Sequence, residues 1–301
     1  MNAILRNLFL AASLMLLWAA SGARADGEIL KPFVLGSKGP GAVADKVAAA
    51  KTALQANGFT IAGSYSPYPD ATIIVVTNDE MKSTAAKSEH GGFGAAQRVS
   101  VTKVHDEVQV SYTNPTYMAN GYRMAGDLPQ TSEKLKAALG KVEEFGAKGL
   151  SASELRKYHY MFGMEYFDEP VILAEYGSHE EALKAVEANL AAGKGGCTKV
   201  YRVDVPGKKE SVFGVAMKGG DKYMDDKYIM SVIDFGDLKG SAHLPHEMLV
   251  TGNKVIALYA RFRIALDFPD LKMAGANSFM KIMESPEAIR KAMVVAAGGK
   301  E

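Results

Sequence analysis

The chain has 301 residues, with 35 basic and 34 acidic side chains, and its formal net charge at pH 7 is +1. A near-neutral balance without a basic run argues against a nucleic-acid partner and against binding to an anionic membrane surface. Cys197 is the only cysteine, which excludes an internal disulfide and leaves packing as the source of stability. The length suits two domains of roughly 100–150 residues.

The N-terminus has the three parts of a secretory signal peptide. Arg6 supplies positive charge, residues 8–20 are nearly all apolar, and residues 23–25 have the small-x-small pattern that signal peptidases cut. The apolar run is shorter than the roughly 20 residues of a membrane-spanning helix. We therefore expect residues 1–25 to be removed after Ala25, and the mature chain to be periplasmic or secreted and free of the membrane. An uncleaved N-terminal anchor is the alternative. Cleavage leaves 33 basic and 34 acidic side chains, because it removes two basic residues and no acidic one.

Helical and strand-like patterns alternate through the first half of the mature chain. Apolar residues recur at helical spacing before Gly58, and alternating apolar and polar residues on either side of His105-Asp106 indicate a β-hairpin. We expect helices over residues 42–57, 80–88, 115–124 and 131–145, and strands over 59–65, 71–77, 98–104 and 107–113.

A second series of elements begins after residue 170. Ser285 followed by Pro286 is a strong start signal for the last helix, and Gly298-Gly299 ends it. We expect helices over residues 179–192 and 285–297, and strands over 171–176, 197–205, 211–217, 228–234, 248–251 and 254–259.

The two halves share one order of elements. Val99-x-Val101-Thr102 lies over Met248-x-Val250-Thr251 when the two hairpins are aligned. This predicts an α+β protein of two repeated lobes, each an antiparallel β-sheet with helices packed on one face. The other face of each sheet would be covered by the partner lobe, by oligomerisation or by a ligand. The expected divisions are a first lobe over 26–148, an aromatic connector over 149–170 and a second lobe over 171–301.

The connector contains one candidate metal site. Ser151-x-x-Glu154 is a capping box, and it predicts a helix that continues through His159 toward Met164. His159, Met161 and Met164 form an H-x-M-x-x-M motif, and imidazole and thioether ligands are soft enough for Cu(I). The alternative is that this Met and aromatic stripe packs between the two lobes.

The hairpin of the first half carries a family resemblance. The run from Arg98 to Met118, with Val108-Gln-Val-Ser-Tyr-Thr-Asn-Pro-Thr-Tyr, resembles the signature of the prokaryotic domain of unknown function 302. Residues 244–250, Leu-Pro-His-Glu-Met-Leu-Val, resemble that family's entry into the hairpin in the second half. The resemblance covers residues 42–125 and, in a looser form, 179–272. It implies a compact α+β fold, often in tandem, and supplies no activity.

A second candidate metal site lies just before the hairpin of the second half. His243 and His246 are three residues apart, and Glu247 follows them. Imidazole and carboxylate groups suit zinc or copper, although Pro245 disfavours a regular helix here. The alternative interpretation is that these are surface or structural residues.

Two further groups of residues are candidates for ligand binding. Arg261 and Arg263 alternate on a strand-like run and would share one face, where they could grip a carboxylate or phosphate, or instead pair with Asp267 or Asp270. Aromatic walls with a few polar groups are typical of small-molecule sites, and the tail of the first hairpin could supply such a wall or only a packing layer. Its candidate residues are Tyr112, Asn114, Tyr117 and Tyr122.

Motifs of nucleophilic catalysis are lacking, since the sequence has no G-x-S-x-G and no Cys/His signature. The sequence therefore favours an exported, non-catalytic protein that binds a small molecule or a periplasmic protein at a sheet face or between the lobes. The first alternative is a periplasmic copper or other metal-binding protein that uses the connector motif. The second is an enzyme on an unrecognised scaffold. No cofactor is firmly implied, and copper is the candidate.

Overall fold

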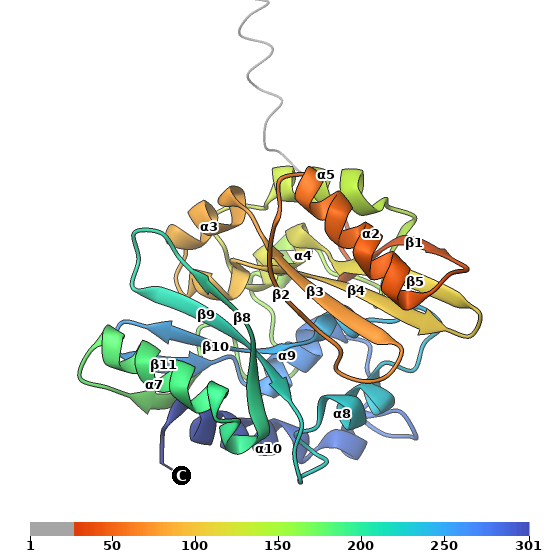
Figure 1. Ribbon diagram of the computed structural model, residues 1–301. Helices are drawn as coiled ribbons and strands as arrows, with labels where there is room; N and C mark the ends of the chain where they lie inside the picture. The colour runs from red at the N-terminus through yellow and green to blue at the C-terminus, as the bar shows by residue number, and fades with distance from the viewer. Residues whose placement is uncertain (1–26, 301) are drawn as a thin grey trace, which may run out of the picture.

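Two antiparallel sheets, one in each lobe, organise the chain in the computed structural model, which describes residues 27–300 (Figure 1). The expected signal peptide lies outside the described residues. The elements of the first lobe are, in chain order, β1 (Phe33–Gly39), α2 (Val43–Ala56), β2 (Thr60–Tyr65), β3 (Ala71–Thr77), α3 (Asp79–Ala86), η1 (Gly91–Gly94), β4 (Gln97–Val104), β5 (Glu107–Thr113), α4 (Pro115–Gly121), α5 (Pro129–Leu139) and β6 (Glu143–Phe145).

The second lobe follows a four-residue helix, α6 (Ala152–Leu155). Its elements are β7 (Val171–Glu175), α7 (His179–Ala191), η2 (Lys194–Gly196), β8 (Cys197–Asp204), β9 (Glu210–Met217), α8 (Asp226–Ile233), η3 (Ser241–His243), β10 (His246–Thr251), β11 (Lys254–Ala257), α9 (Ala260–Asp267), η4 (Phe279–Ile282) and α10 (Ser285–Ala297).

The two sheets have corresponding strand orders. The first is β2-β3-β4-β5-β1-β6 and the second is β7-β11-β10-β9-β8, so β1 to β5 correspond to β7 to β11 in turn. Every pair of neighbouring strands is antiparallel. The predicted α+β fold of two lobes, each with an antiparallel sheet, is therefore confirmed.

Helices cover one face of each sheet, as the apolar periodicity indicates. Helices α2 and α5 pack on the first sheet, and α7 and α10 pack on the second, so that the sheets lie between two helical layers (Figure 1). Leu54 of α2 and Val186 of α7 are fully buried in these layers. The hydroxyl of Ser178 caps the N-terminus of α7 by accepting from the N–H of Glu181.

The other face of the first sheet is polar, and the second lobe buries it. Strand β4 places Arg98, Ser100 and Thr102 on this face, because alternate residues of a strand point the same way. Arg98 donates to the carbonyl of Ala242, and the Thr102 hydroxyl donates to the hydroxyl of Ser241. A polar face that alternation alone would assign to solvent thus lies inside the molecule.

Several element predictions were wrong in a way that has a physical cause. Residues 228–233 of the predicted strand 228–234 belong to helix α8, which the side chain of Asp225 caps at its N-terminus. The predicted helix over 131–145 ends at Leu139, where Gly140 adopts a positive φ of 84°, and a short strand follows. The capping box at Ser151 is confirmed, but its helix ends after one turn. After it, the hydroxyls of Tyr158 and Tyr160 each donate to a carbonyl of the second lobe.

Candidate functional site

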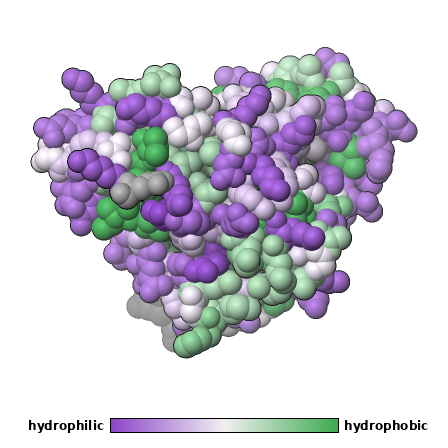
Figure 2. Space-filling model, turned by 90° about the horizontal axis from the view of Figure 1, so that it is seen from below, coloured by the Kyte–Doolittle hydropathy of each residue, from purple (hydrophilic) through white to green (hydrophobic). Residues whose placement is uncertain are grey.

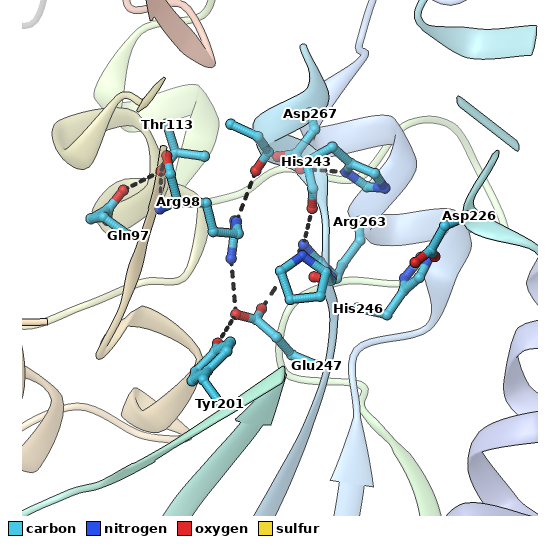
Figure 3. Close-up of polar contacts among 12 residues, drawn as sticks. Gln97, Arg98, Thr113, Tyr201, Asp226, His243, His246, Glu247, Arg263 and Asp267 are labelled. Carbon is cyan, nitrogen blue, oxygen red and sulfur yellow. Dashed lines mark hydrogen bonds and ion pairs between the residues drawn. The ribbon is translucent and has the colours of Figure 1, made fainter. Parts of the chain in front are cut away.

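An ion pair between the lobes forms the centre of the candidate site (Figure 3). Arg98 is the second residue of β4, and Glu247 is the second residue of β10, its counterpart in the other lobe. The Arg98 Nη1 atom lies 2.9 Å from Glu247 Oε1, and both side chains are buried. The hydroxyl of Tyr201 donates to the same Oε1 atom. Burial disfavours the charged guanidinium, but Glu247 together with Asp267 and the neighbouring tyrosines outweighs this effect and raises the pKa of Arg98.

A second buried arginine and a His–Asp pair lie beside this ion pair. Arg263 of α9 donates to the carbonyls of Pro245 and His243, at 3.0 and 2.8 Å. The Nδ1 atom of His243 lies 2.6 Å from Oδ2 of Asp267. Burial lowers the pKa of His243 in spite of the opposing effect of Asp267. His243 is therefore neutral near pH 7, with Nδ1 donating to the carboxylate and Nε2 left as an acceptor.

Asp226, the first residue of α8, joins the lobes at a further point. Its Oδ2 atom accepts from the hydroxyl of Tyr65, in the first lobe, at 3.3 Å and from the N–H of Met217 at 3.1 Å. Its Oδ1 atom lies 4.0 Å from Nε2 of His246. Burial raises the pKa of Asp226 to about 8, and burial together with the charge of Arg263 lowers that of His246. At neutral pH a protonated carboxyl group therefore faces a neutral imidazole.

We call this set of side chains the inter-lobe cluster. Its members are Arg98, Tyr201, Asp226, His243, His246, Glu247, Arg263 and Asp267. Six of its buried polar atoms have no hydrogen-bond partner within the described chain: Asp226 Oδ1, His243 Nε2, His246 Nε2, Glu247 Oε2, Arg263 Nε and Asp267 Oδ1. An unsatisfied buried polar atom costs about 1–3 kcal/mol, so ordered water is expected to complete such a network.

The cluster is balanced in charge and closed to solvent. Two guanidinium groups face the carboxyl groups of Glu247 and Asp267, and each of these four side chains is at most 2 % exposed. Truncating one member of such a buried ion pair leaves an uncompensated charge, which costs about 3–5 kcal/mol. The cluster therefore favours one fixed arrangement of the two lobes.

Two open pockets lie at the edge of the boundary between the lobes and share a wall. The first, which we call the apolar pocket, has a volume of about 290 Å³. Its lining includes Phe33, Phe145, Phe268 and Leu238. The second, which we call the lysine groove, has a volume of about 440 Å³. Its lining includes Tyr68, Thr102, Lys103, Lys227 and Lys239. Asp234 and Phe235, just after α8, line both.

Asp234 is held firmly at this shared wall. Its Oδ1 atom accepts from the N–H of Gly240 at 2.8 Å, and its Oδ2 atom from the hydroxyl of Ser241 at 3.2 Å. Burial raises its pKa to about 6, against the lowering effect of the Gly240 hydrogen bond. Phe235, by contrast, is 56 % exposed, so an aromatic side chain is available to a ligand between the two pockets.

The four residues of the predicted aromatic wall are buried and contact both lobes and the connector. The hydroxyl of Tyr112 donates to the carbonyl of Gly140, and that of Tyr117 donates to the carbonyl of Leu266. Asn114 donates to the carbonyl of Lys31 and to Glu144. Tyr122 stacks on Phe167 with ring centroids 5.7 Å apart. The lining residues of the two pockets include none of these four predicted residues.

The prediction that Arg261 and Arg263 share one face was wrong. Both lie on helix α9, where side chains two residues apart point roughly 200° from each other. Arg261 forms a bidentate pair with Glu165 of the connector at the surface, and its Nε lies 2.9 Å from Oε2. Arg263 points inward to the cluster. The expected pairing of Arg261 with Asp267 or Asp270 is replaced by this contact with Glu165.

The two predicted metal sites have different surroundings. The Nδ1 atom of His159 lies 3.0 Å from the carbonyl oxygen of Met161, whereas Met164 lines a separate small pocket beside Arg261. His243 and His246 lie with ring centroids 5.6 Å apart. Across residues 27–300, no group of three or more His, Cys, Asp or Glu side chains is placed to hold a metal ion. Copper binding at the connector remains a prediction.

One feature of the sequence does indicate the ion pair of the inter-lobe cluster. When the two hairpins are aligned, Arg98 falls over Glu247, so equivalent positions of the two halves carry opposite charges. Asp226, Asp234 and Asp267 give no comparable signal. Their partners are more than five residues away or in the other lobe, and sequence spacing does not show such contacts.

Searches against protein families, curated proteins and solved structures find no match to this chain. The resemblance to domain of unknown function 302 therefore remains an expectation. Among the described helices, none combines the length and apolar character that crossing a membrane requires.

Proposed function

We propose that this chain is an exported, non-catalytic binding protein that holds a small amphipathic anion at the boundary between its lobes. The observation that carries the proposal is the shared wall of the two pockets. One side of Phe235 and Asp234 is apolar and aromatic, and the other side carries three lysines. Apolar walls with a few placed polar groups are typical of small-molecule sites, and both volumes are near the range of such sites.

The charge of the lysine groove favours an anion. Lys103 and Lys227 form no ion pair with any described residue, and Lys239 donates to the carbonyl of Asp234. Three ammonium groups thus line the groove with the carboxyl groups of Asp70 and Asp234, so positive groups outnumber negative ones. A carboxylate or phosphate near the ammonium groups would complete the compensation.

The walls of the apolar pocket suit the uncharged part of the same ligand. Phe33 and Phe268 lie with ring centroids 5.8 Å apart, and Phe33 and Phe145 lie 5.6 Å apart. A Cβ atom at Gly240 would come within 2.8 Å of Phe33 and 3.1 Å of Phe268, so only glycine leaves these rings in place. An aromatic or aliphatic body of a few carbon atoms fits a pocket of this kind.

The inter-lobe cluster supports binding rather than catalysis. Its His243–Asp267 pair resembles a general-base arrangement, but it is fully buried, and neither residue lines either pocket. A general base must come within hydrogen-bond reach of its substrate. The cluster therefore serves to fix the lobes that form the two pockets. The common strand order of the sheets supports an origin of the lobes by duplication, which we include in the proposal.

Isothermal titration with 4-phenylbutyrate and its neutral counterpart 4-phenylbutyramide tests the proposal. We expect the carboxylate to bind and the amide to bind at least tenfold more weakly. The variant Lys103→Glu/Lys227→Glu should weaken carboxylate binding about tenfold, which corresponds to about 1.4 kcal/mol. Lys184 and Lys291 are exposed and line neither pocket, so Lys184→Glu/Lys291→Glu is a control of equal charge. Equal binding of the acid and the amide, or equal loss in both variants, would contradict the proposal.

A further inference from the structure

Three exposed methionines gather in one short segment of the second lobe. Met273, Met280 and Met283 are 37 %, 59 % and 62 % exposed. Methionine is one of the residue types most often found fully buried, and Met81 and Met248 follow that rule here. Three thioethers in contact with water within residues 273–283 therefore call for a physical reason.

The backbone brings the three residues close together. The N–H of Met280 donates to the carbonyl of Met273 at 3.1 Å, which holds these two residues side by side. Met280 lies in the 3₁₀ turn η4, and Met283 follows directly with helical φ and ψ of −58° and −27°. Side chains three residues apart eclipse each other in a 3₁₀ turn, so Met280 and Met283 share one side of it.

The turn is anchored on its inner side. Ile282 is fully buried, and Phe279 lines a small pocket together with Met164 of the connector. The hydroxyl of Tyr228, on α8, donates to the carbonyl of Lys281 at 3.1 Å. Because these contacts fix the inner side, the three thioethers stay on the outer side. Figure 2 shows apolar residues among hydrophilic ones on the face seen from below Figure 1.

We propose that Met273, Met280 and Met283 form an exposed thioether site for a soft monovalent metal ion, Cu⁺ or Ag⁺. Thioethers are neutral, polarisable ligands that select Cu(I) over hard cations. A protein-docking surface would need roughly 1,000 Å² of contact. Here the exposed and charged Lys272, Lys281 and Glu284 flank the thioethers, so the apolar area suits an ion better than a protein.

The flanking charges also predict how such a site behaves. The ammonium groups of Lys272 and Lys281 repel a bound cation, although salt screens exposed charges over about 8–10 Å. We therefore infer a labile site that exchanges its ion readily. It shares no residue with the lysine groove, the apolar pocket or the predicted connector motif. The test of this metal site is therefore independent of the proposed anion binding.

The experiment uses the mature protein with ¹³C-labelled methionine methyl groups, titrated with Ag⁺ as a redox-inert counterpart of Cu⁺. We expect one equivalent to shift three methyl resonances, assigned by the single variants Met273→Leu, Met280→Leu and Met283→Leu. The double variant Met280→Leu/Met283→Leu should bind Ag⁺ at least tenfold more weakly. Leucine is close to methionine in volume, and the sites are exposed, so the fold should persist. Unshifted resonances of Met81 and Met248 would verify this.

The matched control is Met161→Leu/Met164→Leu, which removes the thioethers of the connector motif. It should leave Ag⁺ binding at the three-methionine site unchanged. The proposal is overturned if one equivalent of Ag⁺ shifts none of the three resonances, if the double variant binds as tightly as the wild type, or if only the connector variant loses the ion. In that last case the connector motif would be the metal site.

Discussion

The buried ion pair between the lobes gives the sharpest test of how they are held together. Replacing Glu247 by Gln keeps the size of the side chain and an oxygen for the hydroxyl of Tyr201 but removes the charge that faces Arg98 at 2.9 Å. Arg98 would remain buried, 1 % exposed, without the carboxylate that it pairs with. Removing one partner of a buried pair costs about 3–5 kcal/mol. At roughly 2–4 °C per kcal/mol for a chain of this size, the melting temperature should fall by about 10 °C.

Urea unfolding followed by far-UV circular dichroism measures this cost in a double-mutant cycle. The double variant Arg98→Met/Glu247→Gln removes both charges, and we expect it to be less destabilised than Glu247→Gln alone. The control Glu133→Gln breaks an exposed pair with Lys136 and should change stability by about 0.5 kcal/mol or less. A cost below about 1 kcal/mol for Glu247→Gln, or strictly additive effects in the cycle, would refute the role given to this pair.

Three further predictions concern pH and packing. Because the folded-state pKa of Asp226 is about 8, above its usual 3.8, the folded chain keeps a proton that the unfolded chain releases, and stability falls as pH rises between these values. In urea unfolding, the stability of Asp226→Asn relative to the wild type should therefore rise from pH 5 to 8, by at most about 1.4 kcal/mol per pH unit. A stability difference that does not change with pH would contradict this prediction. Gly63→Ala places a Cβ atom 2.2 Å from the Val200 carbonyl oxygen across the lobes, so thermal melts should show a loss of about 1–3 kcal/mol, whereas Gly39→Ala, which meets nothing within 4 Å, should show much less. Finally, Asp234 has a pKa of about 6, so 4-phenylbutyrate should bind more tightly at pH 5.5 than at pH 7.5 as this carboxylate loses its charge; titration of Asp234→Asn should show no such change.

Local patterns in the sequence determined most of the elements. Strand β3 begins and ends at the predicted residues 71 and 77, and α7 begins at His179 as predicted. These predictions succeeded because alternation and helical periodicity report which side of an element is buried. The strand prediction for residues 228–234 was wrong because the Tyr-Ile-Met-Ser-Val-Ile run is apolar enough for a strand or a helix. The capping carboxylate of Asp225 and the packing of α8 decided for the helix.

The candidate site could be predicted only in part. The sequence pointed to His243, His246 and Glu247 as a candidate metal site, and the structure places the three side chains together in the inter-lobe cluster. Their partners Arg98 and Asp267 were missed as members of that group, because they lie 149 and 24 residues away from the side chains that they contact. Arg263 was selected for ligand binding on one face with Arg261, and the helical geometry of α9 directs it inward, away from Arg261.

What the sequence determined by itself is the set of local conformations and the α+β class, because backbone preference and apolar spacing act over a few residues. Only the tertiary structure decided whether the polar face of the first sheet is buried or exposed to solvent. Arg98, Ser100 and Thr102 alternate with valines as they would on a strand open to water. The second lobe covers them and supplies the opposite charge at Glu247. Burial of a polar group depends on partners distant in the chain, and only the folded chain brings those partners together.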